Sequence, residues 1–153
     1  MDIRALTDDY AVSPQIDPSD IPAIKEAGYT TVISNRPDGE NPPELRNDEM
    51  RRAVEAAGLT FVENPVIGGA LTEDNVTAQA AARDAATGPV LAYCASGNRS
   101  SIMWALTEAG NLATDDIIAT PSRYGYNLEP VRGLIDALAA GQVPVPGPQN
   151  GRF

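Results

Sequence analysis

The chain has 153 residues, of which 42% are hydrophobic, and this is enough for one domain with a substantial core that needs no disulfide or metal. The formal net charge of −10 disfavours a nucleic-acid or anionic-membrane surface, because affinity for either comes largely from clustered Lys and Arg. The sequence contains no histidine, which excludes Ser-His-Asp and Cys-His hydrolases and every histidine metal site. We expect no metal and no cofactor.

The N-terminus and the single cysteine bear on the cellular compartment. The chain opens Met1-Asp2-Ile3-Arg4 without an apolar signal segment, and no apolar run approaches the ~20 residues that a membrane helix requires. One cysteine cannot form an intrachain disulfide, and a reducing compartment keeps its thiol usable. We expect a soluble, cytoplasmic protein that binds neither nucleic acid nor membrane. The sequence leaves its oligomeric state open.

The first part of the chain predicts a hairpin, a helix and a core strand. In order, these are strands at 3–6 and 10–13, a helix of about ten residues between Asp17 and Gly28, and a strand at 29–34. The polar, turn-rich segment 35–43 leaves the carboxyl end of that last strand. This is the edge at which open α/β sheets place their sites.

The middle of the chain alternates helix and strand. The expected elements are a helix at 47–57 with Asn47 as its N-cap, a strand at 59–62, a glycine-containing loop at 65–71, an alanine-rich helix at 72–87 and a strand that leads into Cys94. This alternation predicts an α/β fold with a mostly parallel central sheet flanked by helices and joined by right-handed crossovers.

The last third of the chain predicts helices and then a tail. Helices are expected at 100–109, 114–118 and 127–140, where apolar residues recur at helical spacing. Residues 141–153 are rich in proline and glycine, which is typical of an extended segment outside the core. We therefore expect a single domain at 1–140 followed by a Pro/Gly-rich tail.

The stretch from Val90 to Ser101 joins a buried apolar run to a loop and a helix start, and it holds the only cysteine, Cys94. Small residues at this place direct several backbone N–H groups toward one point, where the orphan amides and the positive helix end favour an anion. The same field favours the nucleophilic thiolate. Arg99 adds a planar fork of donors for oxyanions. The pattern predicts an anion-binding loop beside Cys94.

A lone cysteine at the end of a strand is more often a small buried hydrophobic residue than a nucleophile. The neighbours of Cys94 favour the functional interpretation. Gly97 permits a positive φ or a close backbone approach, and Ser100 offers a hydroxyl within reach of the sulfur. Arg99 places a cation where a structural loop has no need of one.

Four stretches occur in an order that matches one known family: Asp2-Ile3-Arg4, Val32 to Glu40, Pro65-Val66 and Tyr93 to Ser100. On these stretches, over about residues 2–140, the chain resembles the DUF442 family. That family is the phosphatase-like domain of beta-lactamase-hydrolase-like proteins and is also labelled a sulfur transferase family. The resemblance implies a dual-specificity-phosphatase-like fold with Cys94 as nucleophile and Arg99 as oxyanion clamp. It also implies an anion cradle made by the amides of Ala95, Ser96, Gly97, Asn98 and Arg99.

The loop departs from the tyrosine-phosphatase signature, since four residues separate Cys94 from Arg99 where that signature has five, and Tyr93 replaces its histidine. The shorter loop is similar to that of rhodanese sulfurtransferases, whose persulfide has less bulk than a phosphocysteine. Rhodaneses continue with a strand and a glycine pair, however, where residues 114–140 predict more helices. The loop alone favours sulfur transfer, and the fold context favours the phosphatase family.

A phosphatase also needs an acid that protonates the leaving oxygen. The region where related phosphatases hold it, residues 66–69, contains no carboxylate. Asp38 and Asp74 are the nearest candidates, although residues at such places more often form turns or helix caps.

We hypothesise that the Cys94 thiolate attacks a phosphate monoester and forms a phosphocysteine that water releases, with a small anionic or phosphorylated molecule as substrate. The further candidate catalytic residues are Arg99, Asp38 and Ser100. Two alternatives remain: sulfane-sulfur transfer through a Cys94 persulfide, and a catalytically silent anion-binding module.

Overall fold

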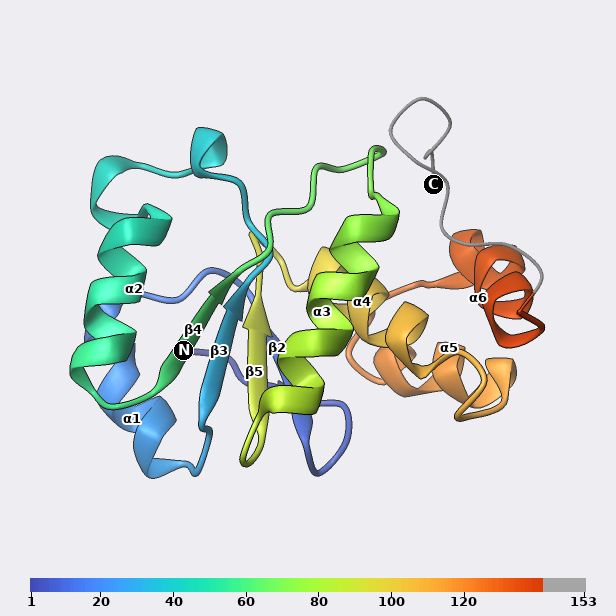
Figure 1. Cartoon of the computed structure of the whole chain (residues 1–153), viewed down its shortest axis with the longest axis horizontal. Coiled ribbons are helices and arrows are strands. Elements are labelled where there is room, and N and C mark those ends of the chain that lie inside the picture. Colours follow the sequence, from blue (N-terminus) through green and yellow to red (C-terminus); the bar gives the residue numbers. More distant parts are fainter. Residues whose placement is uncertain (142–153) are drawn as a thin grey trace.

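The computed structural model describes residues 1–141, which form a five-stranded sheet with the strand order β1-β2-β5-β3-β4 (Figure 1). The strands are β1 (Arg4–Ala5), β2 (Tyr10–Ser13), β3 (Thr31–Ser34), β4 (Thr60–Glu63) and β5 (Val90–Tyr93). Strand β1 runs antiparallel to β2, and the other pairs are parallel. The predicted edge hairpin and the mostly parallel sheet are confirmed.

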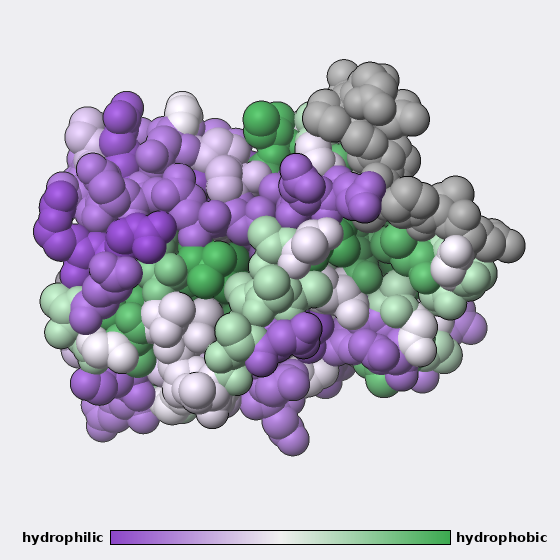
Figure 2. Space-filling model, viewed as in Figure 1, coloured by the Kyte–Doolittle hydropathy of each residue, from purple (hydrophilic) through white to green (hydrophobic). Residues whose placement is uncertain are grey.

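Helices cover both faces of the sheet. They are α1 (Ile21–Glu26), α2 (Asn47–Ala56), α3 (Glu73–Ala85), α4 (Asn98–Glu108), α5 (Thr114–Ser122) and α6 (Arg132–Ala139). In Figure 1, α1 and α2 lie on one side and α3 to α6 on the other. Two apolar clusters result, one with Met50 and Val54 of α2 and a larger one with Met103 and Trp104 of α4. Figure 2 shows hydrophilic surface over α2 and the segment that precedes it.

Several predicted helix boundaries are corrected by the structure. The helix expected from Asp17 divides into a 3-10 turn at Pro18–Asp20 and then α1, because the Asp17 carboxylate caps the turn. The helix expected at 127–140 likewise opens with a 3-10 turn, Glu129–Val131, and α6 follows it. The expected N-cap Asn47 is instead the first residue of α2. The tail from residue 142 onward lies outside the described residues.

The position of β5 between β2 and β3 brings the Cys94 loop to the middle of the carboxyl edge. Tyr93 pairs in register with Ser13 on one side and with Ser34 on the other. The pairing continues one residue further, since the Asn35 N–H donates to the Tyr93 carbonyl at 2.8 Å. The segments that follow β2, β3 and β5 therefore meet beside Cys94, as expected for a parallel sheet.

A buried polar network lies behind this edge. The Gln79 Oε1 accepts from the side-chain amides of Asn35 at 2.9 Å and Asn64 at 2.8 Å. The Gln79 Nε2 donates to the Tyr10 hydroxyl at 2.9 Å, which in turn donates to the Ser100 carbonyl at 3.0 Å. Because its members satisfy one another in a low dielectric, the network fixes the start of α4 relative to the sheet.

Within residues 1–141, no helix has both the length and the apolar composition that a membrane span requires.

Candidate active site

The loop after β5 directs a backbone amide at the only cysteine. Cys94 is 1% exposed, and its Sγ accepts a hydrogen bond from the Gly97 N–H at 3.1 Å. Helix α4 begins directly afterwards at Asn98, two residues before the predicted start. The sulfur therefore lies beside an amide donor and the positive end of a helix, an arrangement that favours negative charge.

Gly97 is required by both the backbone and the packing. Its φ is +96°, the left-handed region that favours glycine. A Cβ at this position would clash with the Tyr126 hydroxyl, since it would lie closer than any packing permits. The predicted positive φ and close approach are both confirmed.

Arg99 forms a bidentate ion pair with Glu40. Its Nη1 donates to Glu40 Oε2 at 2.8 Å and to the Val66 carbonyl at 2.8 Å, and its Nη2 donates to Glu40 Oε1 at 2.7 Å. Hydrogen bonding to Arg99 lowers the pKa of Glu40, and the same bond, with a smaller effect from the Cys94 sulfur, raises the pKa of Arg99. Both terminal nitrogens of the guanidinium thus bind an internal carboxylate.

Arg36 holds Glu40 from a second side. Its Nη2 donates to the Glu40 carbonyl at 2.8 Å, and its Nε lies 3.5 Å from Glu40 Oε1. Glu40 is a site residue that the sequence reasoning did not select. The available signal was its place in the turn-rich segment at the carboxyl edge of β3, and the partner arginine could be identified only from the fold.

The structure gives Asp38 and Ser100 structural contacts. Asp38 Oδ1 accepts the Asn47 N–H at 2.7 Å and so caps the start of α2. The buried Ser100 hydroxyl donates to Asn35 Oδ1 at 2.9 Å, which directs it into the polar network instead of toward the sulfur. Asp74, the other candidate acid, lies exposed in the first turn of α3. The catalytic roles of Asp38 and Ser100 stay predictions.

A small apolar pocket adjoins Arg99. It measures about 140 Å³ and is lined by Val66, Ile67, Gly68, Gly69, Leu71, Asn98, Arg99 and Ile102. Figure 2 shows hydrophobic surface at the upper edge of the molecule, over the segment between β4 and α3. The lining contains no carboxylate, so the pocket suits an uncharged apolar group.

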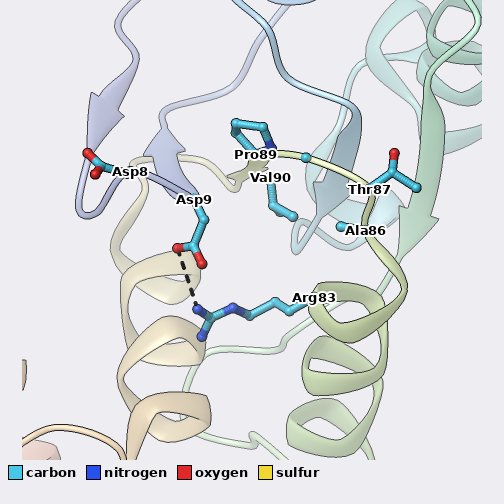
Figure 3. A pocket seen from close by; sticks show the side chains of 8 residues that line it. Asp8, Asp9, Arg83, Ala86, Thr87, Pro89 and Val90 are labelled. Atoms are coloured by element: carbon cyan, nitrogen blue, oxygen red, sulfur yellow. Dashed lines mark ion pairs between the residues drawn. The ribbon is translucent and has the colours of Figure 1, made fainter.

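A second hollow lies at the other end of β5. It measures about 400 Å³ and includes Asp9, Arg83 and Val90 in its lining. In Figure 3, Asp9 and Arg83 point toward one another across it, with their charged groups 3.9 Å apart. Because it opens at the amino end of β5, a whole strand separates it from Cys94.

No group of three or more metal-ligating acidic or cysteine side chains occurs among the residues that the structure describes.

Comparison with known proteins shows which family this chain matches. A family model described as the phosphatase-like domain of beta-lactamase hydrolase-like protein matches residues 2–111. A beta-lactamase hydrolase-like protein of Xylella fastidiosa is 33% identical over 130 residues, which are 84% of this chain and 30% of that protein. One of Agrobacterium fabrum is 33% identical over 112 residues, 72% of this chain and 26% of that protein. This chain thus matches less than a third of the length of each curated relative.

Solved structures share the fold. A candidate phosphatase from Neisseria meningitidis is 33% identical with a TM-score of 0.77, and the match covers 89% of this chain and 97% of that one. PTPMT1 in complex with PI(5)P is 14% identical with a TM-score of 0.71 over 92% of this chain and 96% of that one, which shows the fold alone. The expected cysteine-phosphatase-like fold is confirmed.

The Glu40–Arg99 pair predicts an effect on anion binding. We expect the Glu40→Gln variant to bind inorganic phosphate about two- to tenfold more tightly than the wild type, because a neutral amide competes less for the guanidinium. Isothermal titration calorimetry measures this affinity. Glu44→Gln removes the same charge from an exposed position nearby and should leave the affinity unchanged. Weaker binding by Glu40→Gln would show that Glu40 orients Arg99 instead of competing with the anion.

Proposed function

Because the chain belongs to the family of phosphatase-like domains of beta-lactamase hydrolase-like proteins, we propose that it is a cysteine-dependent hydrolase of a phosphate monoester. The single observation that carries this proposal is the loop geometry. The Gly97 N–H faces the Cys94 sulfur at 3.1 Å, and the guanidinium of Arg99 belongs to the first turn of α4, which follows directly. A nucleophile and an oxyanion donor are thereby combined at the start of one helix.

The proposed reaction has two steps. The Cys94 thiolate attacks phosphorus, so that an S–P bond forms while the P–O bond to the leaving group breaks and its electron pair departs on oxygen. Water then attacks the phosphocysteine, the S–P bond breaks, and inorganic phosphate and the thiolate are released. Arg99 and the amides of residues 95–99 stabilise the equatorial oxygens in both steps.

Phosphate binding would displace Glu40 from Arg99. The carboxylate and the incoming phosphate compete for the same two terminal nitrogens of the guanidinium, which bind Glu40 at 2.7 and 2.8 Å. A phosphate dianion carries more charge than a carboxylate and is the stronger partner for an arginine fork. In this scheme Ser100 has a positioning role: its hydroxyl donates a hydrogen bond to the Asn35 side chain, in the polar network that fixes the start of α4.

The leaving group is proposed to be apolar. The pocket beside Arg99 is comparable in size to an engineered protein cavity of about 150 Å³ that binds benzene. PTPMT1, a fold neighbour, was solved with PI(5)P, which is consistent with a phosphorylated substrate here as well. Aryl phosphates are therefore suitable assay substrates.

Sulfur transfer is the second candidate, and the shorter loop favours it. Only four residues separate Cys94 from Arg99, and a persulfide fits a tighter loop than a phosphocysteine does. In this reaction the thiolate would attack the outer sulfur of thiosulfate, the S–S bond would break, and sulfite would leave with the electron pair.

Intact-mass spectrometry distinguishes the two reactions. After incubation with p-nitrophenyl phosphate and acid quench, we expect the wild type to carry one phosphoryl group. Cys94→Ser should carry none and should have no turnover, because a serine in this loop has no base to ionise it. Thiosulfate, tested separately, should add no sulfur. A sulfur adduct without a phosphoryl adduct would favour the transferase, and full activity of Cys94→Ser would rule out covalent catalysis at this residue.

The role of Asp38 is tested by leaving-group dependence. Asn at this position keeps an oxygen that can accept the Asn47 N–H, so a purely structural role predicts equal rates for Asp38→Asn and wild type on both alkyl and aryl phosphates. A general acid contributes about 10²–10⁴-fold and matters most for a poor leaving group. A selective loss of alkyl phosphate turnover in steady-state assays would therefore assign the proton to Asp38 and contradict the structural role.

A further inference from the structure

We propose that Tyr126 is a positioning residue for Cys94: its hydroxyl holds and polarises the peptide group between Ser96 and Gly97, whose N–H faces the sulfur. The inference rests on the proposed function, in which Cys94 reacts as a thiolate. Tyr126 follows α5, outside the stretch 2–111 that matches the family model.

The hydrogen bonds run through a single amide. Tyr126 Oη donates to the Ser96 carbonyl at 2.8 Å, and the Gly97 N–H donates to Cys94 Sγ at 3.1 Å. The carbonyl and the N–H belong to the same peptide unit, and in a trans peptide they point in opposite directions. The phenol and the sulfur therefore lie on opposite sides of one planar group.

Such an arrangement strengthens the bond to sulfur. A donor at the carbonyl oxygen draws electron density from the amide nitrogen, so its hydrogen becomes more positive. Condensed-phase estimates put the mutual strengthening of hydrogen bonds in a chain at about 10–30% per bond. Removal of the phenol O–H should therefore weaken the stabilisation of a thiolate without moving any group that touches the sulfur.

Arg4 and Asp2 extend the chain of hydrogen bonds beyond Tyr126. Arg4 Nη1 donates to Tyr126 Oη at 2.6 Å, and the guanidinium lies over the ring, 5.4 Å from its centroid. The Asp2 carboxylate accepts from Arg4 Nε at 3.1 Å and fixes the orientation of the guanidinium. Burial raises the pKa of Tyr126, so the phenol remains protonated and donates at neutral pH.

Two further polar groups face the sulfur, and both are bonded elsewhere. Arg99 of α4 and Tyr10 of β2 interact with it electrostatically; Arg99 is paired with Glu40, and Tyr10 donates to the Ser100 carbonyl. Substitution of Tyr126 leaves both in place. Because Tyr126 also interacts with Cys94 directly through electrostatics, the position of the Gly97 amide proton is needed to assign a change in thiol reactivity to the Ser96–Gly97 peptide.

The test measures Cys94 alkylation by iodoacetamide as a function of pH. We expect Tyr126→Phe to move the midpoint of the reactivity profile to higher pH and to lower the rate at pH 7 about 1.3- to fourfold, because the hydrogen bond to sulfur is weakened and not removed. The Gly97 amide proton should also move upfield in the NMR spectrum. Tyr124→Phe is the matched control, because its hydroxyl donates to the Ala5 carbonyl at 2.9 Å and not to the loop.

A second variant keeps the test decisive if Tyr126→Phe destabilises the fold. Arg4→Met retains the phenol and should shift the profile in the same direction by a smaller amount, and the double variant should show less than the sum of the two single effects. An unchanged profile in both folded variants would overturn the proposal. Alkylation needs no turnover, so a profile that shifts without any phosphoryl adduct would refute the phosphatase function and leave this inference standing.

Discussion

The left-handed backbone of Gly97 is the constraint on which the candidate site depends. With φ at +96°, the chain ends β5, passes Cys94 and begins α4 within a few residues. This turn aims the Gly97 N–H at the sulfur and leaves its Cα against the Tyr126 hydroxyl. A residue with a side chain would combine left-handed strain of about 1–2 kcal/mol with a direct clash. Glycine at position 97 therefore allows the chain to turn from β5 into α4 with its amide directed at the sulfur.

Positive charge is concentrated at one place in this acidic protein. The net charge is −10, yet Arg99 and Arg36 converge on one carboxylate at the carboxyl edge of the sheet. Glu40 neutralises this local positive potential. The internal ion pair thereby prevents a desolvated cation from standing alone, and under the proposed function it would favour ligands with more charge than a carboxylate.

Local sequence signals predicted the elements better than the contacts between them. The apolar strands and Gly58, which ends α2 with a φ of +84°, follow from propensity and backbone freedom, and the alternation of strand and helix predicted the mostly parallel sheet. The Glu40–Arg99 pair could not be predicted, because 59 residues separate the partners and only the strand order brings them together. The same holds for Tyr126, 30 residues from the carbonyl that it binds.

The most direct test of the anion cradle is an NMR titration with tungstate, a tetrahedral oxyanion, monitored at the backbone amides. The account predicts saturable shifts at residues 95–100, with Arg99→Ala abolishing them, since the fork and the amides bind the same group. Gly97→Ala should lose the response as well. Shifts centred on the hollow around Arg83, or no saturable response at residues 95–100, would contradict the central claim that this loop is built to hold an oxyanion.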